Sequence, residues 1–238
     1  MCLEIDRFIN GIKSTSANYQ YKMQGLFDVS GECIGYEVLI DQQRSKEILP
    51  GPNVHSDLTF SSSTNYLIQR IKVAIENRRF ESEWSGKYLF LNVERSNLCD
   101  ITLLTRLVEL NHYLLQRQIV LVVEVTERNV CGSCNRIGEG LLLLKQNGIV
   151  TAADDFDIYN GDFRHKELET GWYEFIKIQS PETKKDIEKL VVFTHLRPEK
   201  VIIERVESVS IFHTLLDLQS VFWGFQGYCF DKGTPIYI

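Results

Sequence analysis

The chain has 238 residues, a net charge of −6, 44% hydrophobic residues and 24% charged residues. This composition is typical of a soluble globular protein with enough apolar side chains to fill a sizeable core. The acidic balance argues against a nucleic-acid-binding surface, which rests on clustered cations, and no apolar stretch of the sequence is long enough to span a membrane.

The first half of the chain predicts a β-hairpin followed by alternating helices and strands. The segment MCLEIDRFINGIKS lacks a continuous apolar core, so we expect no signal peptide and a cytoplasmic protein. Ser30 and Gly31 suit the turn of the hairpin, and Asp100 suits a helix N-cap. The predicted elements are strands over 21–29 and 32–40, a helix over 57–79, a strand over 88–94, a helix over 101–117 and a strand over 119–126.

The second half continues the same alternation. Gly148 suits the C′ position that ends one helix, whereas Ser180 and Pro181 suit the N-cap and first position of another, which Pro198 ends. Cys131 and Cys134 form a CxxC without the further ligands of a zinc site, so a redox pair and two ordinary cysteines both fit. The predicted elements are strands over 149–155, 173–178, 200–204 and 221–227, with a last helix over 207–219.

About eight strands with helices between most of them predict an α/β protein with a (β/α)8 barrel, for which about 250 residues are typical. The rival is a doubly wound open sheet, but no Gly-rich phosphate loop follows the first strand. No linker, low-complexity tract or internal repeat divides the sequence, so we expect one domain over 1–238.

Seven successive predicted strands carry an amide, a carboxylate or a lysine at a similar depth. These residues are Glu37, Asn92, Glu124, Asp154 with Asp155, Lys177, Glu204 and Gln226. At the rim of a barrel, the five carboxylates would repel one another unless cations offset them. Oxygen-rich clusters of this kind suit Mg²⁺ or Mn²⁺, and an adjacent aspartate pair can bridge two such ions. The alternative is that the carboxylates pair with Lys177 and Arg205 or cap helices.

The order of these residues resembles the motif pattern of EAL domains, the phosphodiesterase domains that linearise cyclic di-GMP in bacteria. The resemblance runs from Gln24 to Pro235 and implies a modified (β/α)8 barrel whose first strand is antiparallel to the rest. The matching segments are GYEVL (35–39), FLNVERS, VEVTE (123–127), AADDF, FIKIQ, IIERVES and FQGYCF.

The resemblance also implies roles for single residues. It implies first-metal ligands at Glu37, Asn92, Glu124 and Asp154, a bridging or second-metal ligand at Asp155, a water-positioning lysine at Lys177, remaining site members at Glu204 and Gln226, substrate contacts at Gln24 and Leu39, and a loop anchor at Glu127.

Several positions depart from the family pattern, among them Gly25 for the proline of the substrate strand and Val38 for an alanine, and four departures bear most on the site. They are Asp41 for a phosphate-binding arginine, Asp157 for the glycine after DDF, Gln179 for the aspartate of KxD and Arg205 for the glycine of EGVE. A carboxylate at Asp41 would repel the phosphate that an arginine should bind, and Gln179 cannot act as a base. We therefore expect little or no hydrolysis.

Three functions follow from the resemblance. We favour a regulator of the motility type that binds a protein partner, such as the transcription activator of flagellar genes. The alternative is an active Mg²⁺- or Mn²⁺-dependent phosphodiesterase that converts cyclic di-GMP to linear pGpG. A receptor that binds cyclic di-GMP without hydrolysis is disfavoured by Asp41.

Overall fold

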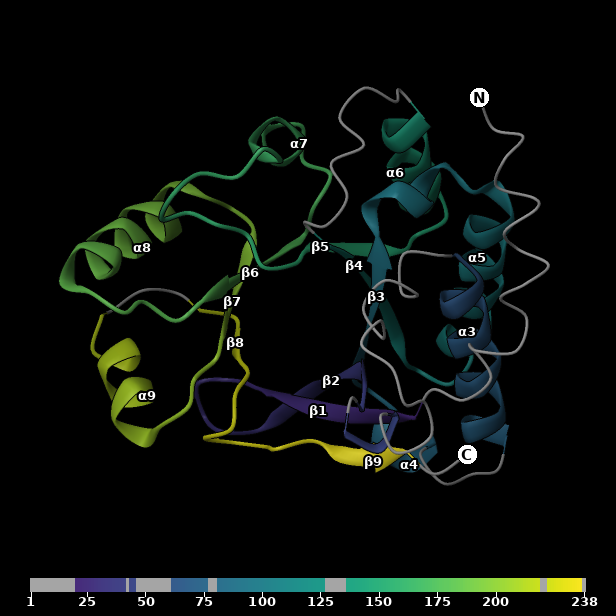
Figure 1. The fold of residues 1–238 in the computed structure, drawn as a ribbon, viewed down its shortest axis with the longest axis horizontal. Coiled ribbons are helices and arrows are strands. Elements are labelled where there is room, and N and C mark those ends of the chain that lie inside the picture. Colours follow the sequence, from purple (N-terminus) through teal and green to yellow (C-terminus); the bar gives the residue numbers. More distant parts are fainter. Residues whose placement is uncertain are drawn as a thin grey trace.

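The strands of the chain close into one barrel whose first strand runs against its neighbours (Figure 1). The computed structural model describes residues 20–41, 43–45, 61–76, 81–126, 136–218 and 222–236. Strand β1 (Tyr21–Phe27) pairs antiparallel with both β2 (Cys33–Ile40) and β8 (Gly224–Phe225), and every neighbouring pair from β2 to β8 is parallel. The barrel and the antiparallel first strand expected from the sequence are both confirmed.

The remaining elements surround or extend this barrel. The other barrel strands are β3 (Tyr88–Glu94), β4 (Val120–Thr126), β5 (Val150–Ala153), β6 (Phe175–Gln179) and β7 (Lys200–Glu204), and β9 (Thr234–Ile236) pairs with β1 outside them. The helices are α3 (Ser61–Glu76), α4 (Glu81–Trp84), α5 (Ile101–Leu115), α6 (Arg136–Gln146), α7 (His165–Glu169), α8 (Lys184–Leu196) and α9 (Val209–Leu216), with a 3-10 helix η3 (Arg95–Cys99). No described helix has the length and apolar character that crossing a bilayer requires.

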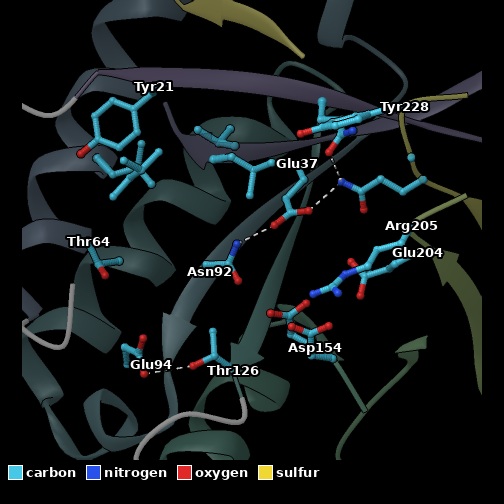
Figure 2. A pocket seen from close by; sticks show the side chains of 18 of the residues that line it. Tyr21, Glu37, Thr64, Asn92, Glu94, Thr126, Asp154, Glu204, Arg205 and Tyr228 are labelled. Carbon is cyan, nitrogen blue, oxygen red and sulfur yellow. Dashed lines mark hydrogen bonds between the residues drawn. The ribbon is translucent and has the colours of Figure 1, made fainter. Parts of the chain in front are cut away.

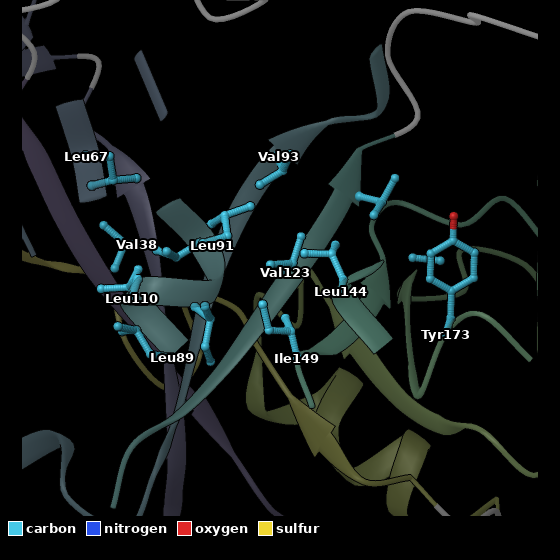
Figure 3. Close-up of a cluster of buried hydrophobic side chains, with 14 of the residues drawn as sticks. Val38, Leu67, Leu89, Leu91, Val93, Leu110, Val123, Leu144, Ile149 and Tyr173 are labelled. Atoms are coloured by element: carbon cyan, nitrogen blue, oxygen red, sulfur yellow. The ribbon is translucent and has the colours of Figure 1, made fainter. Parts of the chain in front are cut away.

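The outward-facing side chains of the strands form the core with the helices. In Figure 1, α3, α5 and α6 cover one flank of the barrel, and α8 and α9 lie on the opposite flank. Leu89, Leu91 and Val93 alternate along β3 and meet Leu110 of α5 and Leu67 of α3 in one buried cluster (Figure 3). Alternation is expected because successive strand side chains point to opposite faces.

The inward-facing side chains form a second apolar layer, which we call the floor. Its members are Leu26, Phe90, Val122, Ala152, Phe175 and Ile202, all fully buried. Trp223 packs edge-on against Phe175, with ring centroids 4.5 Å apart, so it belongs to the packing of the barrel. Because strand side chains repeat every two residues, the residues two positions further along β3 to β7 lie directly above the floor. That next layer is polar.

Several predicted boundaries need correction. The helix predicted to begin at Ser180 begins after Thr183, because Thr183 and Asp186 form a reciprocal capping box. The strand predicted over 221–227 is only β8, and β9, α4 and α7 were not predicted. By contrast, the Asp100 carboxylate accepts hydrogen bonds from the N–H groups of Thr102 and Leu103, so the predicted N-cap is confirmed. The predictions on Glu127, on the CxxC motif and on the ends of the 57–79 helix lie outside the described residues.

Candidate functional site

Polar side chains from seven strands meet around a cavity of about 530 Å³ above the floor (Figure 2). The sequence-predicted residues that line it are Gln24, Glu37, Leu39, Asn92, Asp154, Asp155, Glu204, Arg205 and Gln226. Glu124 and Lys177 are completely buried next to these side chains. The structure also adds lining residues that the sequence did not single out, namely Glu94, Thr126, Glu207 and Tyr228.

The ammonium group of Lys177 lies at the centre of the cluster. Its Nζ atom is 2.8 Å from Glu124 Oε1, 2.8 Å from Glu204 Oε1, 2.9 Å from Glu37 Oε2 and 3.5 Å from Asp154 Oδ1. Four carboxyl groups therefore share one cation, which sums to a formal charge of −3 if all are ionised. This arrangement is the ion pairing that the sequence left open as the alternative to a metal site.

The cluster reduces this excess charge by holding protons. Burial raises the pKa of Glu204 to about 8, assisted by the nearby charges of Asp154 and Glu37. Burial and the neighbouring carboxylates likewise hold the pKa of Glu124 well above its ordinary value. Burial acts on Glu37 in the same direction, but the charge of Lys177 and the hydrogen bonds it receives outweigh burial and lower its pKa. The four carboxylates in turn overcome burial and raise the pKa of Lys177.

Amide side chains fix the orientation of Glu37. Asn92 Nδ2 donates to Glu37 Oε1 at 2.6 Å, and Gln226 Nε2 donates to Glu37 Oε2 at 2.8 Å. Gln226 also donates to Gln24 Oε1 at 3.2 Å, and Gln24 Nε2 donates to the carbonyl of Asp231. Gln24 and Glu37 are directly paired across β1 and β2, so the antiparallel first strand brings Gln24 into the site.

The donor set fits a hard divalent cation but is not assembled around one. Glu124 Oε2 and Gln226 Oε1 are buried acceptors without a hydrogen-bond partner among the described residues, and such atoms usually find a partner. Carboxylate and amide oxygens are the ligands that Mg²⁺ and Mn²⁺ prefer. In the described part of the chain, no three His, Cys, Asp or Glu side chains form a ready-made metal cluster. We attribute this to Lys177, which holds the carboxylates.

The structure does not support the phosphate repulsion predicted for Asp41. Its Oδ1 atom accepts a hydrogen bond from the N–H of Arg44 at 3.1 Å, and its Oδ2 lies 3.7 Å from Arg44 Nη1. Asp41 is buried and is not among the residues that line the cavity. The carboxylate is therefore directed into a local cap and ion pair, and the departure removes an arginine without adding a charge to the cavity wall.

Of the two other departures, Arg205 lines the cavity together with Asp155, whereas Gln179 is not a lining residue but contacts Asp155. Gln179 Nε2 donates to Asp155 Oδ1 at 3.0 Å. Arg205, where the resemblance predicts a glycine, has φ +54°, in the left-handed region that glycine adopts without strain. Figure 2 shows its side chain beside Glu204, on the same side of the cavity as Asp154. Asp155 itself has φ +45°.

The loop after β5 contains Asp157, which stands where the resemblance predicts a glycine. The Asp157 carboxylate accepts hydrogen bonds from the N–H groups of Tyr159 and Asn160, so it closes a local turn instead of entering the cavity. Arg164 is fully buried beneath Asp154 and Asp155, a contact that sequence reasoning missed. From sequence alone, an arginine near the start of a helix is expected to be exposed to solvent. Only the three-dimensional packing shows that Arg164 is buried.

Comparison with known proteins identifies the fold. Neither a protein-family profile nor a curated protein matches the sequence. The solved structures that match include Klebsiella pneumoniae BlrP1 with calcium and cyclic di-GMP (TM-score 0.72, 17% identity, 94% of this chain and 58% of that chain) and an EAL-domain protein from Listeria monocytogenes EGD-e (0.65, 18%, 96% and 92%). A third is the PaMucR phosphodiesterase with cyclic di-GMP (0.67, 18%, 92% and 97%). The chain therefore has the EAL-domain fold.

Proposed function

We propose that the chain is a divergent EAL-domain protein of cyclic di-GMP signalling that hydrolyses cyclic di-GMP slowly or not at all and acts by binding a protein partner. The observation that carries the proposal is the contrast between two halves of the cavity. The metal half consists of Glu37, Asn92, Glu124 and Asp154 around Lys177. The second half consists of Asp155 and Arg205, which line the cavity, together with Gln179, which is hydrogen-bonded to Asp155.

The metal half keeps the donors for one divalent cation. Glu37, Asn92, Glu124 and Asp154 would hold Mg²⁺ or Mn²⁺, and the unpartnered Oε2 of Glu124 supports this assignment. When bound, the ion would polarise a phosphate oxygen and lower the pKa of a water ligand. BlrP1, which shares the fold, has been solved with manganese or calcium together with cyclic di-GMP.

The second half lacks what turnover requires. Asp155 contributes −1 and Arg205 contributes +1, so with the neutral Gln179 the formal charge sums to zero. A second divalent cation gains little attraction from such a group of residues. The Gln179 amide donates a hydrogen bond to the Asp155 carboxylate but cannot accept a proton from an attacking water. We therefore expect one metal ion to bind and hydrolysis to be impaired.

The test is a hydrolysis assay on wild type and a repaired variant. Wild type and the double variant Gln179→Asp/Arg205→Gly are mixed with cyclic di-GMP and Mn²⁺, and linear pGpG is measured by chromatography. We expect trace product from wild type and a rise of about 100-fold or more in the double variant, because it regains a basic carboxylate and loses the competing cation. Calorimetric titration with Mn²⁺ should give one ion for wild type and two for the variant.

The partner is tested separately. We propose a transcription regulator of flagellar genes, the partner class implied by the family resemblance. Purified regulator is mixed with wild type and with Glu37→Ala, and complexes are separated by size-exclusion chromatography. Complex formation by both proteins supports a partner function that does not use the metal half. If neither protein forms a complex, this part of the proposal is wrong.

An active phosphodiesterase is the second candidate, and one observation favours it. Asp41 does not line the cavity, so the repulsion that argued most strongly against substrate binding is absent. Robust hydrolysis by wild type at ordinary enzyme concentration would replace our proposal with this one.

A further inference from the structure

Arg164 lies below Asp154 and donates hydrogen bonds to four different residues. Its Nη1 donates to the carbonyl of Val125 at 2.8 Å, and its Nη2 donates to the carbonyls of Asp154 at 2.7 Å and Asp155 at 3.4 Å. Its Nε and Nη2 also donate to the two oxygens of Asp162 at 2.9 and 2.7 Å. The guanidinium group therefore joins the end of β4 to the two residues that follow β5.

The carboxylate of Asp162 compensates the buried positive charge of Arg164. Its side chain is 4% exposed and that of Arg164 is 0% exposed, so the pair is isolated from solvent. The bidentate contact matches the planar fork of a guanidinium to a carboxylate, which a lysine cannot reproduce. Although burial opposes it, the hydrogen bonds from Arg164 lower the pKa of Asp162, so the carboxylate stays ionised.

The backbone held by Arg164 sets the directions of the two neighbouring carboxylates. Asp154 extends toward Lys177, whereas Asp155 extends toward Gln179. Asp155 has φ +45°, a conformation that a non-glycine residue keeps when surrounding contacts fix it. The N–H of Asp154 also donates to the carbonyl of Val125, which Arg164 contacts as well.

We propose that Arg164 is a positioning residue of the site: with Asp162 it fixes the backbone of Asp154 and Asp155, so that one carboxylate serves each half of the cavity. The consequence for metal binding rests on the proposed function, but the consequence for the backbone does not.

The experiment compares Arg164→Lys and Arg164→Met with wild type by two readouts. Hydrogen exchange followed by mass spectrometry reports on the backbone over 154–157, and calorimetric titration reports Mn²⁺ affinity, both well below each variant's melting temperature. We expect faster exchange over 154–157 in both variants. We expect Mn²⁺ affinity to fall by about 10- to 100-fold, the usual effect of removing a residue that orients a ligand.

Arg95→Met is the matched control. Arg95 is also a buried arginine paired with a carboxylate, that of Glu167, and it also lies against the ring of Phe163. The carbonyls of Asp154 and Asp155 accept hydrogen bonds from Arg164, so Arg95→Met leaves these two contacts in place. This variant should melt at a lower temperature and keep wild-type exchange over 154–157 and wild-type Mn²⁺ affinity.

The outcomes separate the two proposals. If wild type binds no Mn²⁺, the proposed metal half is wrong, and the exchange comparison still tests the positioning role. If Arg164→Lys melts lower but exchanges over 154–157 like wild type, Arg164 is only a structural residue and our inference is wrong. Should Arg164→Met not fold, Arg164→Lys and Asp162→Asn carry the same test.

Discussion

At the scale of single residues, backbone conformation marks the wall of the site. Arg205 and Gln118 both have left-handed backbones, with φ of +54° and +59°. Arg205 lines the cavity, whereas Gln118 is exposed in the turn after α5. The two residues therefore carry similar strain, and only one of them carries a charge next to the candidate site.

Arg205→Gly should stabilise the protein and alter the site. Glycine relieves the left-handed strain but makes the unfolded chain more flexible, so we expect a net gain of about 0.5–1 kcal/mol in the free energy of unfolding, or about 1–4 °C in melting temperature. Gln118→Gly should give the same gain without changing Mn²⁺ binding, as measured by calorimetry. A loss of stability in Arg205→Gly would mean that the arginine side chain makes a stabilising contact that outweighs strain.

Glu204 should make the metal-free protein less stable as the pH rises. Its pKa is about 8 in the folded state, above the ordinary value of 4.5. Its contribution to stability is therefore complete below about pH 4.5 and is lost as the pH rises through 8. Glu124 acts in the same direction. Melting temperatures without divalent ions should thus fall between pH 5 and 8, and less steeply in Glu204→Gln.

Metal binding should reverse that trend, because a cation binds the deprotonated carboxylates. Mn²⁺ affinity should rise with pH up to about pH 8. The control is Glu174→Gln, which removes an exposed carboxylate paired with Lys200 and should leave the slope unchanged. A flat pH profile in wild type would show that neither Glu124 nor Glu204 holds a proton in the folded state.

At the scale of elements, the bounds of a strand or helix were predicted correctly where the sequence offered only one residue or pattern that could define them. Strands β3, β4 and β7 were predicted within one residue because each is an apolar run bounded by helical patterns. The predicted start of α8 was wrong because Ser180 and Thr183 are both good N-cap residues. Only the partner Asp186 distinguishes them, since Thr183 and Asp186 bind each other's backbone N–H.

Thr183→Ala should therefore destabilise α8, and Ser180→Ala should not. Loss of the cap should lower the free energy of unfolding by about 1 kcal/mol. The Ser180 hydroxyl donates an exposed hydrogen bond to the carbonyl of Arg205, so we expect its removal to change the free energy of unfolding by less than about 0.5 kcal/mol. Urea denaturation of both variants is the measurement. A larger loss in Ser180→Ala would contradict the capping box.

At the scale of the whole molecule, barrel closure explains which parts of the site could be predicted. The polar residues were predictable because each lies at a strand end and the fold brings strand ends together. The direction of the Asp41 carboxylate could not be predicted, because it depends on an ion pair with Arg44 that the alternation of residues along a strand does not encode. Arg164 was missed for the same reason, since it contacts the site through backbone carbonyls of β4 and of the segment after β5.

The layered barrel also makes Lys177 the residue on which the site depends. The floor excludes water below it, and four carboxyl groups surround it. Lys177→Met would leave those groups buried without their cation, which typically costs about 3–5 kcal/mol and here should lower the melting temperature by about 6–20 °C. Some of the loss will be offset by protons on Glu124 and Glu204, so the deficit should grow with pH.

A divalent cation should restore part of that loss if the carboxylates form a cation site. Millimolar Mn²⁺ should raise the melting temperature of Lys177→Met by more than it raises that of wild type, because in the variant no ammonium group competes for the same oxygens. Lys200→Met, which removes an exposed partner of Glu174, should lose little stability and show only the wild-type response to Mn²⁺. If Lys177→Met is destabilised and Mn²⁺ has no effect on it, the cluster is an ion-pair network centred on lysine and the metal half does not exist.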